Sequence, residues 1–323
     1  MHRMVRSLFC FVALGGLAAG AFAQDFPTRS VRIVVPQSPG GGTDIFARAI
    51  AQRLSTRWGQ PVVVDNRAGA AGTLGTDLVA KAPADGYTLL VTYAGSQAIN
   101  QSLYPKLPFD SIKDFQTIAT VAVTPFFVVL KKDASARDLR DFLAQAKAKP
   151  GSVSFASSGN GSVPHLIGEM LMLETGVRFL HVPYKGIAQA LTDVLGGQVD
   201  SAITSVPSAV QHVGNGSMRA LAVTSPKRIS IAPSVPTVAE SGIPGFDVNP
   251  WWGILGPAGM DMRVVRKINA DVAEILKSAE AQAFFRTQGA DVLITTPEEF
   301  ARILASDVEK WAKVVKASGA RID

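Results

Sequence analysis

The chain alternates between short apolar segments and longer amphipathic ones, and this alternation constrains its fold more than any other feature. The stretch VRIVV at 31–35 is typical of a buried strand, and residues 43–59 carry apolar side chains at helical spacing. Residues 61–66 and 86–93 predict further strands, with a helix at 72–82 between them. Strands that alternate with helices favour parallel sheets covered by helices. The sequence therefore predicts the α/β class.

The same alternation continues after residue 150. We expect strands at 151–157, 178–184, 198–206 and 218–225, the last two directly in succession, and helices at 161–176, 186–197, 263–278 and 296–318. Thr296 and Glu299 form a capping-box pattern at the start of the last helix.

So many strands in about 300 residues are more than one sheet usually holds, which favours two domains. Two apolar strands run almost back to back in VAVTPFFVVLKK, as if the chain crossed from one sheet to another, and a return is expected within 245–257. The predicted domains are 24–122 plus 250–323, and 123–249. A cleft between two such domains is a common kind of ligand site.

The N-terminal segment 1–23 has the features of a secretory signal peptide. A basic start is followed by a short apolar run and by small residues in AFA, which predicts cleavage before Gln24 and export to the periplasm. A membrane anchor is the alternative. The single cysteine, Cys10, lies inside this segment, so the mature chain would have no disulfide, no cysteine nucleophile and no thiolate metal ligand.

The charge pattern argues against a nucleic-acid partner. The formal charge of +6 falls to +4 once Arg3 and Arg6 leave with the signal, and no run of Lys and Arg is present. A mild positive charge favours the approach of anions.

A glycine-rich turn, SPGGGTD at 38–44, connects a predicted strand to a predicted helix. Such a turn directs free N–H groups and the positive end of a helix dipole at one point, which is an anion site. A nucleotide P-loop is excluded because no Lys follows Gly42. A dinucleotide fingerprint lacks its third glycine at Ile45, although Asp65 could mimic the ribose-binding acid. A tight turn packed on the sheet is the remaining interpretation.

A second strand, polar turn and helix occur in SFASSGNGSVPHL. Two such loops facing each other across a cleft could hold both ends of a short dianion. An ordinary helix start with Ser162 as the N-cap is the alternative. We expect His165 to hydrogen-bond this loop rather than to act in catalysis.

Catalytic patterns are scarce. The sequence has no His-x-x-x-His, no His-Glu-x-x-His and no Gly-x-Ser-x-Gly stretch, and Ser162 with His165 does not make a triad. We therefore expect no metal and no cofactor, and a hydrolase remains only as a minor alternative.

Several stretches, in the family's own order, resemble the substrate-binding receptors of tripartite tricarboxylate transporters, the TctC or Bug family of periplasmic solute-binding proteins. They include VRIVVPQSPGGGTDIFAR, HVPYKGIAQALTDVLGGQVD, WWGILGPAG and WAKVVKASGARID, and they run through nearly the whole chain after residue 23. The resemblance implies a type II-like periplasmic-binding-protein fold. In it, two parallel-type sheets are joined by two crossing strands, and the two domains close on a carboxylate without catalysis.

The family's binding loops hold opposite parts of the ligand, largely through main-chain N–H groups and ordered water. The matching positions of the two loops, the floor and the second-domain rim are Gly40, Gly41, Gly42, Thr43 and Asp44; Ser157, Ser158, Asn160, Gly161, Ser162 and His165; Ala94, Gly95 and Ser96; and Tyr184 and Lys185. Bare glycines would leave N–H groups open to a carboxylate as charge-assisted donors.

The chain departs from the family pattern at two places. Gln37 and Ser38 replace an aromatic residue and a proline that are usual at the first loop, while Thr204 and Ser205 stand where the family often has an acid and an amide. An ammonium group in a closed cleft needs a carboxylate partner. Asp44 is the only acid in the two loops, and its expected role is to cap backbone N–H groups. A shift of two or three residues in the match would bring in Asp200.

The sequence thus predicts an exported, monomeric receptor that captures a small carboxylate without an ammonium group. It would deliver this ligand to membrane transporter subunits. Use of the same fold as a ligand sensor for a signalling partner is the main alternative.

Overall fold

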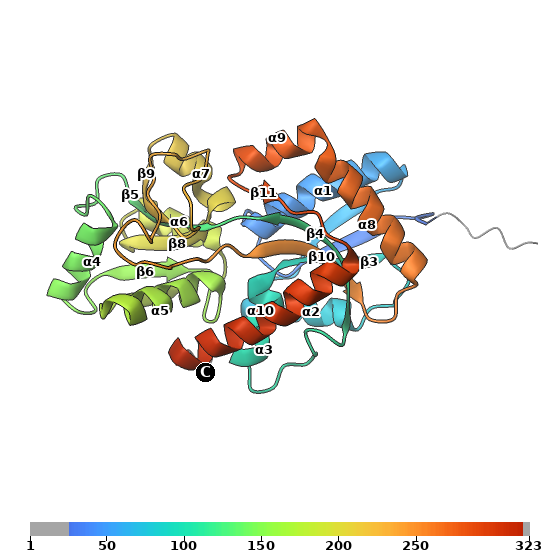
Figure 1. Ribbon diagram of the computed structural model, residues 1–323, viewed down its shortest axis with the longest axis horizontal. Helices are drawn as coiled ribbons and strands as arrows, with labels where there is room; N and C mark the ends of the chain where they lie inside the picture. The colour runs from blue at the N-terminus through green and yellow to red at the C-terminus, as the bar shows by residue number, and fades with distance from the viewer. Residues whose placement is uncertain (1–25, 319–323) are drawn as a thin grey trace, which may run out of the picture.

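The computed structural model describes residues 26–318, so the predicted signal segment, Cys10 and the cleavage site lie outside the described residues. The described strands form one sheet of six strands and one of five. Helices cover both sheets, and the two resulting α/β domains lie side by side (Figure 1).

The six-stranded sheet has the strand order β11-β4-β10-β3-β1-β2. Around it, α1, α8 and α9 lie on one face and α2, α3 and α10 on the other (Figure 1). The elements are β1 (Val31–Val35), α1 (Gly42–Trp58), β2 (Val62–Asn66), η1 (Ala70–Gly72), α2 (Thr73–Ala80), β3 (Thr88–Tyr93), η2 (Gly95–Ile99), α3 (Asn100–Leu103), β4 (Phe115–Val123), β10 (Trp251–Pro257), α8 (Met262–Lys277), α9 (Ala279–Thr287), β11 (Asp291–Val292) and α10 (Pro297–Ser318).

The five-stranded sheet has the order β7-β6-β8-β5-β9. Its elements are β5 (Phe126–Lys131), α4 (Leu139–Ala148), β6 (Ser154–Ser157), α5 (Val163–Thr175), β7 (Leu180–Pro183), α6 (Ile187–Leu195), β8 (Ser201–Ser205), α7 (Val206–Gly214) and β9 (Met218–Val223).

Both sheets are mixed, whereas the strand and helix alternation predicts parallel ones. β1 is parallel to β2 and β3, and β6 is parallel to β7 and β8. In contrast, β10 is antiparallel to β3 and β4, and β5 is antiparallel to β8 and β9. β10 and β5 are the strands by which the chain enters from the other sheet. A strand that arrives from that side runs in the opposite direction to the strands it joins.

The two crossings lie next to each other. β4 ends at Val123 and β5 begins at Phe126, while β10 begins directly after Pro250. The Thr124 N–H donates to the Pro250 carbonyl at 3.3 Å, so the two crossing segments are hydrogen-bonded where they pass between the sheets. The domain bounds predicted from the sequence stay a prediction.

The sequence prediction does not include the helices α3, α4, α7 and α9, and α7 contradicts it directly. α7 lies between β8 and β9, which we expected to follow one another directly. Pro207 stands in the first turn of α7. A proline is tolerated there because its missing N–H would have no intrahelical partner. The capping box of α10 is confirmed: the Thr296 N–H donates to Glu299 Oε2 at 2.8 Å, and the Glu299 N–H donates to Thr296 Oγ1 at 3.1 Å.

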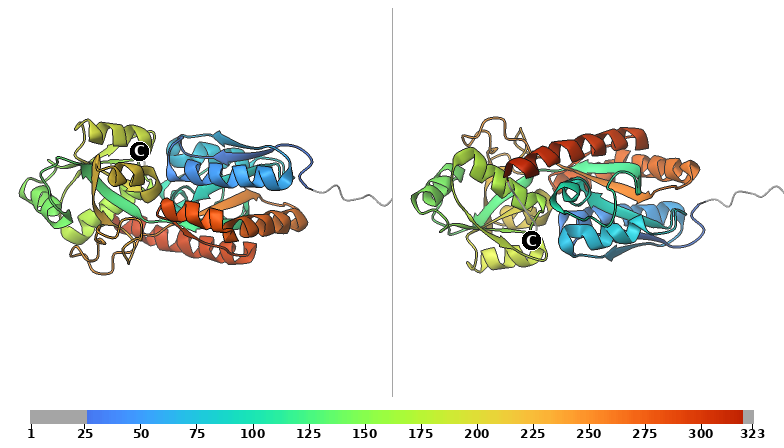
Figure 2. Two further views of the ribbon diagram at one scale, coloured as in Figure 1. Left: turned by 90° about the horizontal axis from the view of Figure 1, so that it is seen from above. Right: turned by 90° about the horizontal axis from the view of Figure 1, so that it is seen from below.

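α10 extends along the first domain toward the second (Figure 2), where it contacts α5. Among residues 26–318, no helix combines the length and the hydropathy that a membrane span needs.

Candidate ligand-binding cleft

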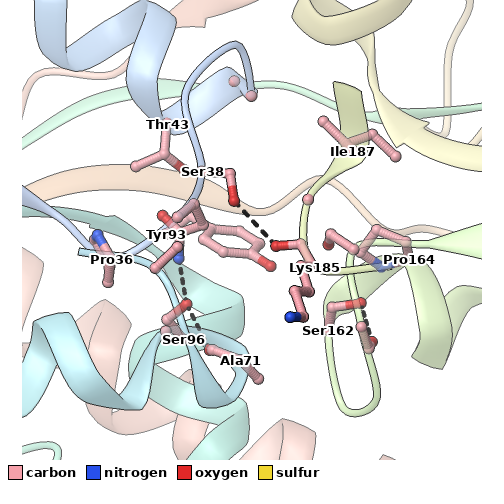
Figure 3. Close-up of a pocket in the computed structure, with 18 of the residues that line it drawn as sticks. Pro36, Ser38, Thr43, Ala71, Tyr93, Ser96, Ser162, Pro164, Lys185 and Ile187 are labelled. Carbon is pink, nitrogen blue, oxygen red and sulfur yellow. Dashed lines mark hydrogen bonds between the residues drawn. The ribbon is translucent and has the colours of Figure 1, made fainter. Parts of the chain in front are cut away.

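A cleft with a volume of about 660 Å³ lies between the two sheets, and residues of both domains line it (Figure 3). Clefts of this size suit small organic ligands. Of the residues selected from the sequence, those that line it are Gly41, Gly42, Thr43, Ser96, Ser158, Asn160, Ser162, Tyr184, Lys185, Thr204 and Ser205.

The other selected residues do not line the cleft: Gly40, Asp44, Ala94, Gly95, Ser157, Gly161 and His165. Three of them, Asp44, Ser157 and His165, accept hydrogen bonds from the backbone of the two loops.

The three glycines of the first loop differ in what they require. Gly40 has a φ of 81°, a conformation that favours glycine. A Cβ on Gly42 would lie 2.8 Å from Ser205 Oγ, which comes from the other domain. Gly41 needs neither, since its φ is −81° and a Cβ would meet only ordinary contacts at 3.7 and 3.8 Å. Gly41 therefore leaves space in the cleft that no neighbouring protein atom fills.

Asp44 is buried behind this loop and supports it. Its carboxylate accepts hydrogen bonds from the Gly40 N–H at 3.1 Å and from Asn66 Nδ2 at 3.0 Å, and it pairs with Arg48 at 2.9 Å. Burial acts to raise the pKa of Asp44, but the bonds from Arg48, Gly40 and Asn66 together hold it below the ordinary 3.8. Asp44 thus caps the Gly40 N–H, in line with its expected role. This N–H group is therefore already hydrogen-bonded.

The N-terminus of α1 faces the cleft. Gly41 is its N-cap residue, and Gly41, Gly42 and Thr43 line the cleft. N–H groups in the first turn of a helix have no intrahelical acceptor, and they carry the positive end of the helix dipole. The Thr43 side chain is fixed by Trp252, whose Nε1 donates to Thr43 Oγ1 at 3.0 Å.

The second loop is stabilised by its own hydroxyl groups. Ser157 Oγ accepts from the Gly159 N–H at 3.1 Å, and Ser162 Oγ donates to the Gly159 carbonyl at 2.7 Å. Ser162 is the N-cap residue of α5, but its side chain makes no capping hydrogen bond. The expected N-cap position of Ser162 is therefore confirmed, but its hydroxyl closes the loop instead of capping an N–H group of the helix.

His165 supports the loop, as the sequence suggested. The Gly161 N–H donates to His165 Nδ1 at 3.0 Å. This leaves the ring proton on Nε2, which lies 3.3 Å from Glu169 Oε1. Because Ser162 and His165 both bond to the loop backbone, they do not form the nucleophile and base pair that a hydrolase would need.

A second histidine stacks on the first. The rings of His165 and His181 have centroids 4.1 Å apart, and His181 Nε2 lies 2.7 Å from Ser157 Oγ. Burial, together with the neighbouring His165, lowers the pKa of His181 to about 3. His181 is therefore neutral near pH 7, and its Nε2 can accept a hydrogen bond from the Ser157 hydroxyl.

Direct contacts join the two sides of the cleft. Ser38 Oγ donates to the Lys185 carbonyl at 3.0 Å (Figure 3). The Tyr93 hydroxyl accepts a hydrogen bond from the Val163 N–H at the start of α5. Burial is the main reason that the pKa of Tyr93 is raised to about 12, so its hydroxyl is protonated at neutral pH.

The apolar wall and one loop of the cleft were not predicted from the sequence. Tyr93 and Phe126 both stack on Trp252, at centroid distances of 5.5 and 6.3 Å, and all three line the cleft. The loop at 68–72 also lines it, with positive φ at Gly69, Ala70, Ala71 and Gly72. The run AGAAG was its only sequence signal.

Carboxylates are missing from the cleft wall within residues 26–318, where neither Asp nor Glu is among the lining residues. Asp200, the alternative acid, accepts from the Ser154 N–H and hydroxyl at 2.8 and 2.6 Å and lies outside the cleft. In the same part of the chain, no group of three His, Cys, Asp or Glu residues is placed to hold a metal ion.

Two α/β domains around a cleft are the architecture of a solute-binding protein. Residues 46–320 match the family described as the tripartite tricarboxylate transporter family receptor, TctC. The chain belongs to this family. Its members are binding proteins and not enzymes, so the protein binds its solute without converting it.

The curated relatives include Protein BugT of Bordetella pertussis, which is 38% identical over 323 residues, covering 100% of this chain and 99% of the relative. Another, from Pseudomonas sp. strain P51, is described as a UPF0065 protein in the tcbD-tcbE intergenic region. It is 39% identical over 291 residues, with 90% and 86% covered.

Solved structures confirm the fold class. The periplasmic binding protein BugD has a TM-score of 0.88 at 35% identity, with 92% of this chain and 99% of that chain covered. An R. palustris protein with adipate gives 0.90 at 35%, covering 92% and 100%. MatC from Rhodopseudomonas palustris with bound malate gives 0.84 at 32%, covering 90% and 100%.

Proposed function

We propose that the protein is a periplasmic receptor that captures a small carboxylate without an ammonium group and delivers it to a membrane transporter. One observation carries the proposal: the N-terminus of α1, bare at Gly41, faces a cleft that no acidic side chain lines in the described chain. Directed N–H groups bind a carboxylate through charge-assisted hydrogen bonds, so the site needs no arginine.

The absence of an acid from the described cleft wall supports the ammonium-free part of the proposal. An amino acid would bring a cation into the cleft, and an unpaired buried charge is costly. Thr204 and Ser205 offer hydroxyl groups there, and Asp44 is already bonded to Gly40, Arg48 and Asn66. The adipate and malate of the two R. palustris proteins are likewise carboxylates without an ammonium group.

The remaining parts of the proposal rest on the family and on the sequence. We place the mature N-terminus at Gln24 and expect a monomer, with domains at 24–122 plus 250–323 and at 123–249. N-terminal sequencing of the exported form tests the cleavage site, and limited proteolysis tests the domain bounds.

Matched ligand pairs test the ligand class. Protein freed of any co-purified compound by unfolding and refolding is screened by thermal shift with succinate against aspartate and glutarate against glutamate. We expect stabilisation by the ammonium-free member of a pair. Stabilisation by the amino acid alone would refute the proposal, and mass spectrometry of the compound released on unfolding identifies the native ligand independently.

A further inference from the structure

Lys185 is the one charged side chain among the described residues that line the cleft. No acidic side chain within residues 26–318 forms an ion pair with it. The cleft therefore has two positive features. One is the N-terminus of α1 on the first domain, and the other is the Lys185 ammonium group on the second.

The backbone at Lys185 is held firmly, so its side chain starts from a defined point. The Lys185 carbonyl accepts from Ser38 Oγ at 3.0 Å, and the preceding Tyr184 N–H donates to the Ser157 carbonyl at 3.1 Å. The Tyr184 hydroxyl donates to Asp193 at 2.7 Å, which fixes the side chain next to Lys185. Figure 3 shows the Lys185 side chain extending away from Thr43, toward the level of Ser96 and Ser162.

The wall between these two positive features is apolar. The Tyr93 ring lies between Thr43 and the Lys185 side chain (Figure 3). Phe126, Trp252 and Ile187 also line the cleft. A ligand that reaches from the α1 N-terminus to Lys185 passes this wall, which favours hydrocarbon in the middle of the ligand and anions at both ends.

We propose that Lys185 is a specificity-determining residue, which binds the second carboxylate of a dicarboxylate with an apolar spacer. This inference rests on the proposed function, because the first carboxylate is taken to lie at the α1 N-terminus. A lysine that only attracts anions to the cleft mouth is the alternative, and it would not distinguish one carboxylate from two at equilibrium.

The test uses pairs of acids that differ only in the second carboxylate: glutarate and pentanoate, adipate and hexanoate, pimelate and heptanoate. Affinities are measured by calorimetry for the wild-type protein, for Lys185→Met and for Lys185→Arg. Lys147→Met is the matched control, since Lys147 is an exposed lysine in α4 of the same domain and does not line the cleft.

We expect the wild-type protein to prefer the dicarboxylate of at least one pair by about tenfold or more, the size of one charge-assisted hydrogen bond. Lys185→Met should abolish that preference by weakening dicarboxylate binding more than monocarboxylate binding, while Lys185→Arg and Lys147→Met should keep the preference. If the preference for the dicarboxylate survives in Lys185→Met, or if the wild-type protein lacks it, this inference is wrong but the proposed receptor function still stands. Failure of the wild-type protein to bind any of these acids or those of the first screen overturns both.

Discussion

The three glycines of the first loop differ in whether the protein structure itself requires a glycine. Gly40 needs its positive φ, and Gly42 needs to be bare because Ser205 approaches it. Gly41 has no such structural need, so of the three glycines it is the one whose substitution best tests the proposed ligand contact. The sequence predicts a binding role for the loop, but the difference among the three glycines depends on contacts from the second domain that no local pattern contains.

Substitution of Gly41 tests the binding loop. In Gly41→Val the added methyl groups occupy the cleft in front of the first-turn N–H groups of α1. Loss of two charge-assisted bonds would cost about 3–6 kcal/mol, so we expect ligand affinity to fall by about two to four decades. Gly41→Ala should give an intermediate loss. Calorimetry measures both, with circular dichroism as the check on folding, and unchanged affinity in Gly41→Val would exclude this loop as the site.

His181 predicts a pH dependence of stability. Its pKa is about 3 in the folded protein and about 6.5 in an unfolded chain. Between these values only the unfolded chain binds the proton, so stability present above pH 6.5 is lost as the pH falls toward 3, by up to about 1.4 kcal/mol per pH unit. We expect His181→Gln to show a shallower loss in urea unfolding between pH 7 and 4. Equal slopes for the two proteins would contradict the assignment.

At the scale of elements, local signals gave most helices and strands but not their pairing. Periodicity located β1, α1 and α5, and the capping residues located the start of α10. The antiparallel entry of β10 and β5 was missed because strand direction is set by where the chain comes from, which a short window does not contain. The aromatic wall was missed for the same reason, since Tyr93, Phe126 and Trp252 come from three separate strands.

The capping box of α10 offers a test at this scale. Thr296→Ala removes the acceptor of the Glu299 N–H, and loss of such a cap typically costs about 1 kcal/mol. We expect Thr296→Ala to lower the free energy of unfolding measured in urea by this amount. Thr296→Ser should keep most of the wild-type stability because the hydroxyl remains. The same loss in both variants would show that the hydroxyl is not what matters.

At the scale of the whole molecule, the cleft depends on how the six-stranded and the five-stranded sheet meet. Within residues 26–318 the chain passes between the two sheets at two adjacent segments, where the Thr124 N–H donates to the Pro250 carbonyl. Ser38 and Tyr93 reach the second domain across the cleft. Few connections at the crossing and direct contacts at the rim suit a hinge that opens to admit a ligand and closes around it. We therefore expect ligand binding to compact the protein.

Gly186 gives a direct test of this closure. Its backbone is extended at φ −172°, which any residue can adopt, yet a Cβ there would lie 2.7 Å from Ser38 Cβ and Oγ on the opposite domain. Gly186→Ala should therefore resist closure. We expect about tenfold weaker ligand binding, from an overpacking cost of about 1–3 kcal/mol, and a smaller ligand-induced decrease in the radius of gyration measured by small-angle scattering.

A compensating substitution separates closure from any direct effect on the ligand. Ser38→Gly removes both atoms that the new methyl group would meet, so the double variant Ser38→Gly with Gly186→Ala should recover compaction and bind about as well as Ser38→Gly alone. Gly214→Ala is the control, because a Cβ at this position of α7 meets nothing within 4 Å, and it should leave binding and compaction unchanged. Such coupling is expected only for residues in contact. If the double variant remains as open as Gly186→Ala, then contact between Ser38 and residue 186 does not limit closure, and the position acts on the ligand itself.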